Sequence, residues 1–268
     1  MKSNRVSRIA LCALLAALPL TFGCYVNTNT GGCSHRNLRA KAERSAELTA
    51  PLAEVTSLRV ATGVGSIRLT AADVAEAQIT AQITVKARTE EEALILVEQV
   101  QIRENRRGEQ LTVEAIKPSD FGRNELAVDY TITVPGRLAV TSRTNVGDIR
   151  IDGFGQRVEA ATDVGKILCA GLRSQAKLHA NVGDIHATYA EDAPSAVELT
   201  ATTNVGNIEF TGPADISARL SASANVGSIN TDRPLTVSGP MKGSVKASLG
   251  QGEGDIALST NVGSITIR

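Results

Sequence analysis

Aspartates recur at one position of a repeated turn, and stacked carboxylates of this kind could bind calcium. Asp148, Asp184 and Asp255 each follow a glycine and precede an isoleucine. Repeats rich in Gly and Asp form calcium β-rolls, because this ion takes oxygen ligands. The equivalent residue between Asp148 and Asp184 is Lys166, however, and a bound cation cannot share its column. We therefore expect a charge-compensated surface ladder and no metal.

The other candidates for chemistry form two loose pairs. His179 and His186 share one repeat but lack a third ligand, which favours a solvated or structural role. Asp152 and Glu159 are acids that would flank a glycosidic bond if the fold brought them together. No nucleophile elbow, phosphate loop or Cys–His pair occurs. The sequence predicts that the protein is not an enzyme and holds no cofactor.

A five-residue phrase that occurs eight times would position these side chains. Its third residue is always Gly, its fifth is always Ile, and its first is Asn, Asp or Gly. Asn, Asp and Gly tolerate positive φ, and Gly permits close stacking, so each phrase is expected to be a tight turn leading to an inward-facing Ile. Stacked Asn side chains can also form an amide ladder. The positions assigned to these turns are Gly65, Asn145, Gly147, Asp163, Gly165, Asn181, Gly183, Asn204, Gly206, Asn225, Gly227, Gly254, Asn261 and Gly263.

The spacing of the turns predicts a solenoid. Gly147, Gly165 and Gly183 are 18 residues apart, and later spacings range from 9 to 27. A constant turn with a varying period is typical of stacked coils with insertions at one loop. We therefore expect an all-β, parallel β-solenoid, right-handed by default, with about six coils at roughly 4.8 Å each. Residues Asp255–Arg268 are expected to form a truncated closing coil.

A less regular segment precedes the repeats. Residues 51–136 are expected to cap the solenoid and begin its sheet, in one domain with the regular coils of residues 137–268. Within this segment Ala77–Ala87 alternates between apolar and polar residues, as a strand does. A capping box predicts a short helix over Thr89–Val97, and Asn105–Gly108 is expected to be a hairpin turn. The domain should therefore contain one helix.

Residues 1–24 predict export. The first eight residues carry three basic side chains and no acid, and the apolar stretch that follows is too short to span a membrane. Gly23 directly before Cys24 resembles the bacterial lipoprotein signal, in which Cys24 would carry the lipid. Thr21 stands where that signal usually has Leu, and ordinary signal cleavage is the alternative. A lipid at Cys24 would anchor the protein in a membrane of the cell envelope.

Residues 25–50 are expected to form a flexible tether between the signal and the domain. Residues 27–32 have little apolar content, and residues 34–48 are charged and could be weakly helical. If Cys24 carries no lipid, a disulfide between Cys24 and Cys33 is open in an oxidising compartment. The chain has 28 basic and 28 acidic residues, so removal of three basic residues with the signal leaves 25 − 28 = −3. This balance argues against a nucleic-acid partner.

The turns also carry a family resemblance. The opening turn Val64–Ile67, the strand-rich middle that ends at Ile132–Pro135, and the repeated Asn-Val-Gly-Asp-Ile turns resemble the bacterial putative adhesin family of unknown-function domains. The resemblance covers roughly residues 55–268. It implies a β-helix in an exported or envelope protein, and it supplies no catalytic residues.

Three classes of function follow. The first is an adhesion or interaction module at the outer membrane or cell surface, or in the periplasm, that presents a solenoid face to a glycan or a protein. The second is a self-assembling envelope scaffold, because the final strand Ser264–Arg268 would leave an open edge for pairing with another copy. The third is a polysaccharide-active enzyme on a β-helix.

Overall fold

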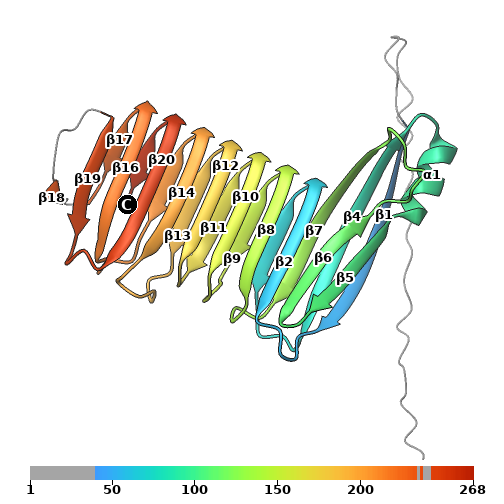
Figure 1. Cartoon of the computed structure of the whole chain (residues 1–268), viewed down its shortest axis with the longest axis horizontal. Helices are drawn as coiled ribbons and strands as arrows, with labels where there is room; N and C mark the ends of the chain where they lie inside the picture. The colour runs from blue at the N-terminus through green and yellow to red at the C-terminus, as the bar shows by residue number, and fades with distance from the viewer. Residues whose placement is uncertain (1–39, 234–235, 238–242) are drawn as a thin grey trace, which may run out of the picture.

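Two β-sheets lie face to face along a rod (Figure 1) in the computed structural model, which describes residues 40–233, 236–237 and 243–268. Each coil places the strand before its turn in one sheet, called sheet B, and the strand after its turn in the other, called sheet A. The coils are β2 (Ser57–Val64) with β3 (Ile67–Ala71), β8 (Ala139–Val146) with β9 (Ile149–Asp152), β10 (Val158–Val164) with β11 (Ile167–Leu172), β12 (Ala176–Val182) with β13 (Ile185–Tyr189), β14 (Glu198–Val205) with β15 (Ile208–Thr211), β16 (Ala218–Val226) with β17 (Ile229–Thr231), and β20 (Gly254–Val262) with β21 (Ile265–Ile267). The predicted all-β, parallel solenoid is confirmed.

The coils stack in register, so equivalent residues form columns. Val158 pairs with Val140 on one side and with Ala176 on the other, and the same alignment continues along the rod. Burial alternates along the strands, and the inward residues are mostly Ile, Val, Leu and Ala. The isoleucine that follows each turn is buried in every coil except the one containing Ile229, which is partly buried. The turn phrase therefore leads into a strand whose first residue packs in the core, as predicted.

A cap closes the N-terminal end of the rod. In sheet A, β7 (Glu125–Val134) continues the parallel stack beside β3, and β4 (Glu76–Ala87) and β1 (Ala40–Pro51) follow antiparallel. Sheet B is extended by β6 (Gln110–Ile116) and then β5 (Gln101–Arg107). The helix α1 (Glu90–Gln99) packs on β1 and β4.

The helix and hairpin expected in the cap are both present. The Thr89 hydroxyl accepts a hydrogen bond from the Glu92 amide at 3.2 Å, which caps the first turn of α1. The hairpin turns at Gly108, with φ +60°, so it lies slightly later than Asn105. No helix among the described residues is long and apolar enough to span a membrane.

The predicted tether is wrong over its second half. Residues 40–51 form β1, which pairs with β4 from Ala40 opposite Ala87 to Pro51 opposite Glu76, so the weak helix is wrong there as well. The inward-facing residues of this strand include Ala42, Ala46 and Ala50. Charged residues lie between them, so the sequence did not show a clear alternation of apolar and polar residues. The predicted signal of residues 1–24, lipidation of Cys24, the disulfide with Cys33 and the tether of residues 25–39 lie outside the described residues.

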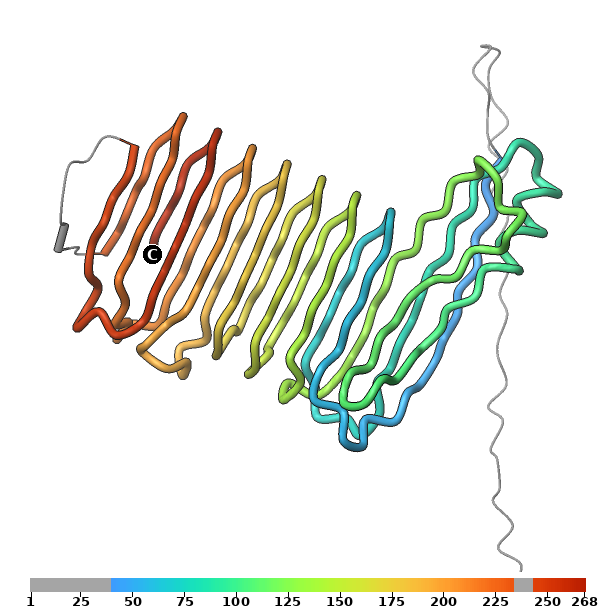
Figure 2. Tube along the Cα trace, viewed as in Figure 1, coloured from blue at the N-terminus to red at the C-terminus, as the bar shows by residue number. Residues whose placement is uncertain are grey.

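The last coil is not a closing coil. Strand β20 lies between β14 and β16, and β21 lies between β15 and β17 (Figure 1), so we call β20 and β21 the inserted coil. Its red trace runs inside the stack (Figure 2). Beyond β16, sheet B ends in β19 (Ser244–Leu249) and β18 (Thr236–Val237). The expected open edge at Ser264–Arg268 is therefore wrong, because β21 is paired on both sides.

Gly254 is also not a turn residue. It begins β20, opposite Ala218, and its φ is not in the left-handed region. An ideal Cβ on Gly254 would overlap the Val197 carbonyl, so the position requires Gly for close packing against the neighbouring coil. The phrase at residues 252–256 resembles the turns by composition only.

Candidate functional site

The turns line up along one long edge of the rod. The glycine of each turn has φ between +128° and +151°, and an ideal Cβ there would overlap a backbone carbonyl of the neighbouring coil. This glycine column consists of Gly65, Gly147, Gly165, Gly183, Gly206, Gly263 and Gly227. These seven positions require Gly, both because of their backbone conformation and because the turns stack closely.

Asparagine side chains form a second column along this edge. The amide of Asn181 donates to Asp163 at 3.1 Å, Asn204 donates to Asn181 at 3.0 Å, and Asn261 donates to Asn204 at 3.1 Å. Asn225 completes this amide ladder by donating to Asn261 at 2.9 Å. The expected ladder is thus present. The expected positive φ at these residues is wrong, because they lie in extended strands.

The aspartate column is a ladder of hydrogen bonds and charges. The Asp148 carboxylate accepts from the Lys166 amide at 2.8 Å, and Asp184 accepts from the Asn207 amide at 2.9 Å. The Lys166 ammonium lies 3.9 Å from Asp184. Asp255 belongs to β20 and lies outside this column. The carboxylates are thus occupied by backbone amides and a lysine, as the charge-compensated ladder predicts.

A threonine column was missed by the sequence analysis. The hydroxyls of Thr144, Thr162, Thr203 and Thr260 donate to the carbonyls of Gly65, Gly147, Gly183 and Gly206, at 2.9–3.1 Å. Each bond joins one coil to the turn of its neighbour. The signal was present in the sequence, because Thr precedes the first residue of most phrases.

Valine, the second residue of the phrase, forms an exposed apolar column between the amide ladder and the glycines. In-register pairing places its members in the order Val64, Val146, Val164, Val182, Val205, Val262 and Val226. Six are 44–48% exposed, and Val226 at the end of the stack is 64% exposed. The only other exposed large hydrophobic residue among the described residues is Ile95 on α1. Nearly all exposed bulky apolar surface is thus gathered on one line.

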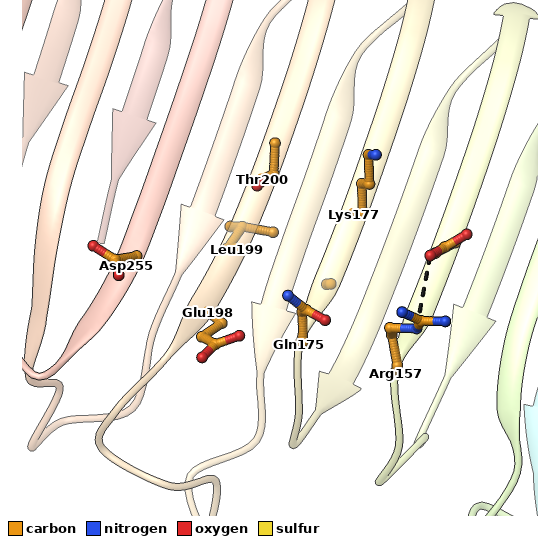
Figure 3. A pocket seen from close by; sticks show the side chains of 9 residues that line it. Arg157, Gln175, Lys177, Glu198, Leu199, Thr200 and Asp255 are labelled. Atoms are coloured by element: carbon orange, nitrogen blue, oxygen red, sulfur yellow. Dashed lines mark ion pairs between the residues drawn. The ribbon is translucent and has the colours of Figure 1, made fainter.

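A groove of about 450 Å³ lies on the outer face of sheet B. Its lining comes from β10, β12, β14 and β20, and it includes the side chains drawn in Figure 3. At its two ends Arg157 lies 3.6 Å from Glu159, and Arg219 forms a two-pronged ion pair with Asp255 at 2.7 and 2.8 Å. The groove is charged and polar, and it has no aromatic side chain.

Two carboxylates of this groove are in-register neighbours. Glu198 on β14 pairs with Asp255 on β20, although 57 residues separate them. A hydrogen bond from Arg219 lowers the pKa of Asp255, which therefore remains ionised. The sequence analysis missed this pair because only the position of the inserted coil brings the two residues together.

The predicted chemical pairs are not brought together. Asp152 lies on β9 in sheet A and Glu159 on β10 in sheet B, so the fold places these two acids on different sheets. His179 and His186 likewise lie on different sheets, and His186 Nδ1 is 3.0 Å from Glu209. Within the described part of the chain, no group of three His, Cys, Asp or Glu side chains could hold a metal ion.

Cys169 is a structural residue of the core. Its side chain is buried, and it forms no disulfide. Burial, with a smaller contribution from Asp152, raises the pKa of the Cys169 thiol to about 12. The thiol is therefore protonated at neutral pH, which makes it a poor nucleophile.

The chain belongs to the Toastrack family, DUF4097, whose model matches residues 36–268. Solved structures that match the chain include a putative cell adhesion protein from Clostridium sporogenes, at 14% identity and a TM-score of 0.48, covering 84% of this chain and 98% of that chain. A putative adhesin from Bacteroides fragilis is also 14% identical, with a TM-score of 0.31, covering 84% and 97%. No curated protein is significantly similar to the chain.

Proposed function

We propose that this domain is a non-enzymatic interaction module of the bacterial cell envelope, and that it binds a protein partner along the valine column. The observation that carries the proposal is the concentration of exposed apolar side chains on that column. Contiguous exposed apolar surface marks interaction sites, because leaving it in water is unfavourable. The adhesin names of the structural neighbours agree with this class of function.

The surface chemistry favours a protein over a glycan. Seven valines in line offer a narrow apolar ridge, flanked by uncharged amides that can bond to a polypeptide backbone. Sugar rings commonly stack on aromatic side chains, and neither the ridge nor the groove of sheet B has one. The partner is therefore expected to place apolar side chains on the valines.

Site-specific photo-crosslinking in intact cells tests this assignment. A crosslinker replaces Val182 on the edge, Lys177 on sheet B or Thr188 on sheet A, all exposed residues of one coil. We expect a discrete protein adduct from position 182 that is absent from positions 177 and 188. The triple variant Val164→Thr, Val182→Thr and Val205→Thr keeps the β-branched shape, and it should abolish the adduct from a crosslinker at Val146. Adducts that form only at Lys177 would reject the valine column and favour the groove.

The envelope location is part of the proposal and has its own test. Residues 1–24 and Cys24 predict export and lipid anchoring. Detergent-phase partitioning and protease shaving of whole cells should show an anchored, accessible protein, and Cys24→Ser should release it. A soluble or protected native protein would place its partner in the periplasm.

The enzyme alternative has one observation in its favour. Glu198 and Asp255 are carboxylates at in-register positions of neighbouring strands and line the same open groove, and paired carboxylates are the groups that most glycosidases use. The ion pair with Arg219 gives Asp255 a structural role, however, and such enzymes also need an acid with a raised pKa. Turnover of envelope polysaccharides that is lost in both Glu198→Gln and Asp255→Asn would establish this alternative.

A further inference from the structure

The inserted coil occupies a slot that the preceding chain leaves open. After β15, residues 212–217 carry the chain past one coil position, and β16 and β17 form the coil beyond it. The chain returns through β19 and then fills the open position with β20 and β21. The two walls of the slot are the coil of β14 and β15 and the coil of β16 and β17. Both walls precede, in the sequence, the inserted coil that fills the slot.

The slot walls recognise the inserted coil through backbone and side-chain bonds. On one wall, the Gly206 and Ile208 amides donate to the carbonyls of Val262 and Ser264 at 2.9 and 3.0 Å. On the other wall, the Gly263 and Ile265 amides of the coil donate to Val226 and Ser228, each at 2.9 Å. The amide ladder crosses the slot through Asn261, and Thr260 bonds to the Gly206 carbonyl at 2.9 Å. Four buried apolar side chains fill the core: Ile256, Leu258, Ile265 and Ile267.

The link to the inserted coil is short and glycine-rich. Gly250 and Gly252 have φ of +55° and +74°, and they lie between β19 and β20. Ser217 Oγ accepts from the Gln251 and Glu253 amides at 3.1 and 3.3 Å, and the Gly252 amide donates to Leu249 at 3.2 Å. Opening this link breaks few bonds, and four residues span about 14 Å.

We propose that the inserted coil can be exchanged between two copies of the chain, each filling the slot of the other. The contacts between the slot walls and the inserted coil are the same whether the coil comes from its own chain or from a second copy. The two arrangements then differ mainly in association entropy and in the strain of the link, so exchange is favoured at high protein concentration. Through this exchange, a second copy of the chain becomes a binding partner. The proposal does not depend on a partner protein binding along the valine column.

Cysteine pairing between copies tests the exchange in the full chain. Thr202 and Ser259 are in-register neighbours on the outer face of sheet B, and strand spacing of about 4.8 Å fits a disulfide. Copies with Thr202→Cys are mixed with copies with Ser259→Cys in a Cys12→Ser, Cys24→Ser, Cys33→Ser background. The mixture is unfolded, refolded together at high concentration and oxidised. We expect an interchain disulfide that forms severalfold more than in a matched mixture of Thr202→Cys and Thr188→Cys, since Thr188 lies on sheet A.

The double variant Thr202→Cys, Ser259→Cys reports whether the bond forms within one chain at low concentration. An intrachain bond there, with no excess bond between the mixed single variants, would overturn the proposal. If the double variant forms no bond, the test uses the refolded chain without the cysteine substitutions at residues 202 and 259. Sedimentation of that chain then decides whether exchange occurs. A dimer formed at high concentration that persists on dilution supports exchange, and a monomer throughout rejects it.

Discussion

At the scale of single residues, the turns can stack along one edge of the rod because their glycines have no Cβ. Gly183 has φ +151°, and an ideal Cβ there would overlap the Gly165 carbonyl. That carbonyl cannot withdraw, because its own coil is held in register on both sides. The glycine column therefore permits the turns to approach as closely as the backbone hydrogen bonds between the coils require.

Gly183→Ala should lower the free energy of unfolding by about 3 kcal/mol, since it combines unfavourable backbone conformation with overpacking. Urea denaturation measures the loss. Gly63→Ala is the matched control, because a Cβ there has no atom within 4 Å. Its effect should remain within about 0.5 kcal/mol. Equal losses in the two variants would contradict the argument.

The amide ladder gives a smaller residue-scale effect. Asn204 bonds to both Asn181 and Asn261, so Asn204→Ala removes two exposed hydrogen bonds and should cost about 1 kcal/mol. Asn145→Ala alters the same column where the structure shows no amide bond to the next coil. Thermal denaturation should show a larger loss of stability in Asn204→Ala than in Asn145→Ala. Equal losses of stability would show that the bonds of the amide ladder contribute nothing.

At the scale of elements, Arg44 joins α1 to β1. Its side chain is buried, Nε donates to the Val97 carbonyl at 3.1 Å, and Nη2 donates to the Val100 carbonyl. These carbonyls lie at the C-terminal end of α1, where the helix itself provides no donors. The guanidinium therefore holds the helix over the end of the core.

Arg44→Met keeps an apolar stem but removes the donors, so two carbonyls lose their partner. We expect a loss of about 2 kcal/mol and faster hydrogen exchange throughout α1. Lys41→Met on the same strand is the control, because Lys41 is exposed. Unchanged exchange in α1 of the Arg44→Met variant would mean that the helix is held by apolar packing alone.

At the scale of the whole molecule, the rod is a continuous two-sheet core with few polar side chains inside. Burial raises the pKa of Tyr130 and of Tyr189 as well as that of Cys169. All three groups are neutral when folded, and each ionises more readily when the chain unfolds. The unfolded state therefore loses protons first as pH rises.

These three groups should consequently leave the free energy of unfolding unchanged between neutral pH and about pH 9, and they should lower it above that pH. For Cys169, the ordinary pKa of 9.0 and the folded value of about 12 bound the window, and each pH unit within it costs about 1.4 kcal/mol. Urea midpoints at pH 8, 9, 10 and 11 measure the slope. Cys169→Ala should make the slope shallower while leaving the contribution of the tyrosines, and parallel slopes would contradict the assignment to Cys169.

Local structure and the repeating architecture follow from the order of residues along the chain. The Asn-Val-Gly phrase encodes its turn through the positive φ that its glycine can adopt, and Thr89 with Glu92 encodes the start of α1. Period-two alternation then requires two sheets with an apolar interior, because it divides each strand into an inward and an outward face. These inferences need no knowledge of which coil neighbours which.

The tertiary structure alone decided which coils are neighbours. In-register columns make any coil a suitable neighbour for any other, so sequence order could not reveal that β20 and β21 lie between earlier coils. The same placement created the Glu198–Asp255 pair and closed the edge expected at Ser264–Arg268. The exposed fraction of each valine also depends on the coils stacked beside it, so only the assembled rod defines the surface proposed to bind a partner.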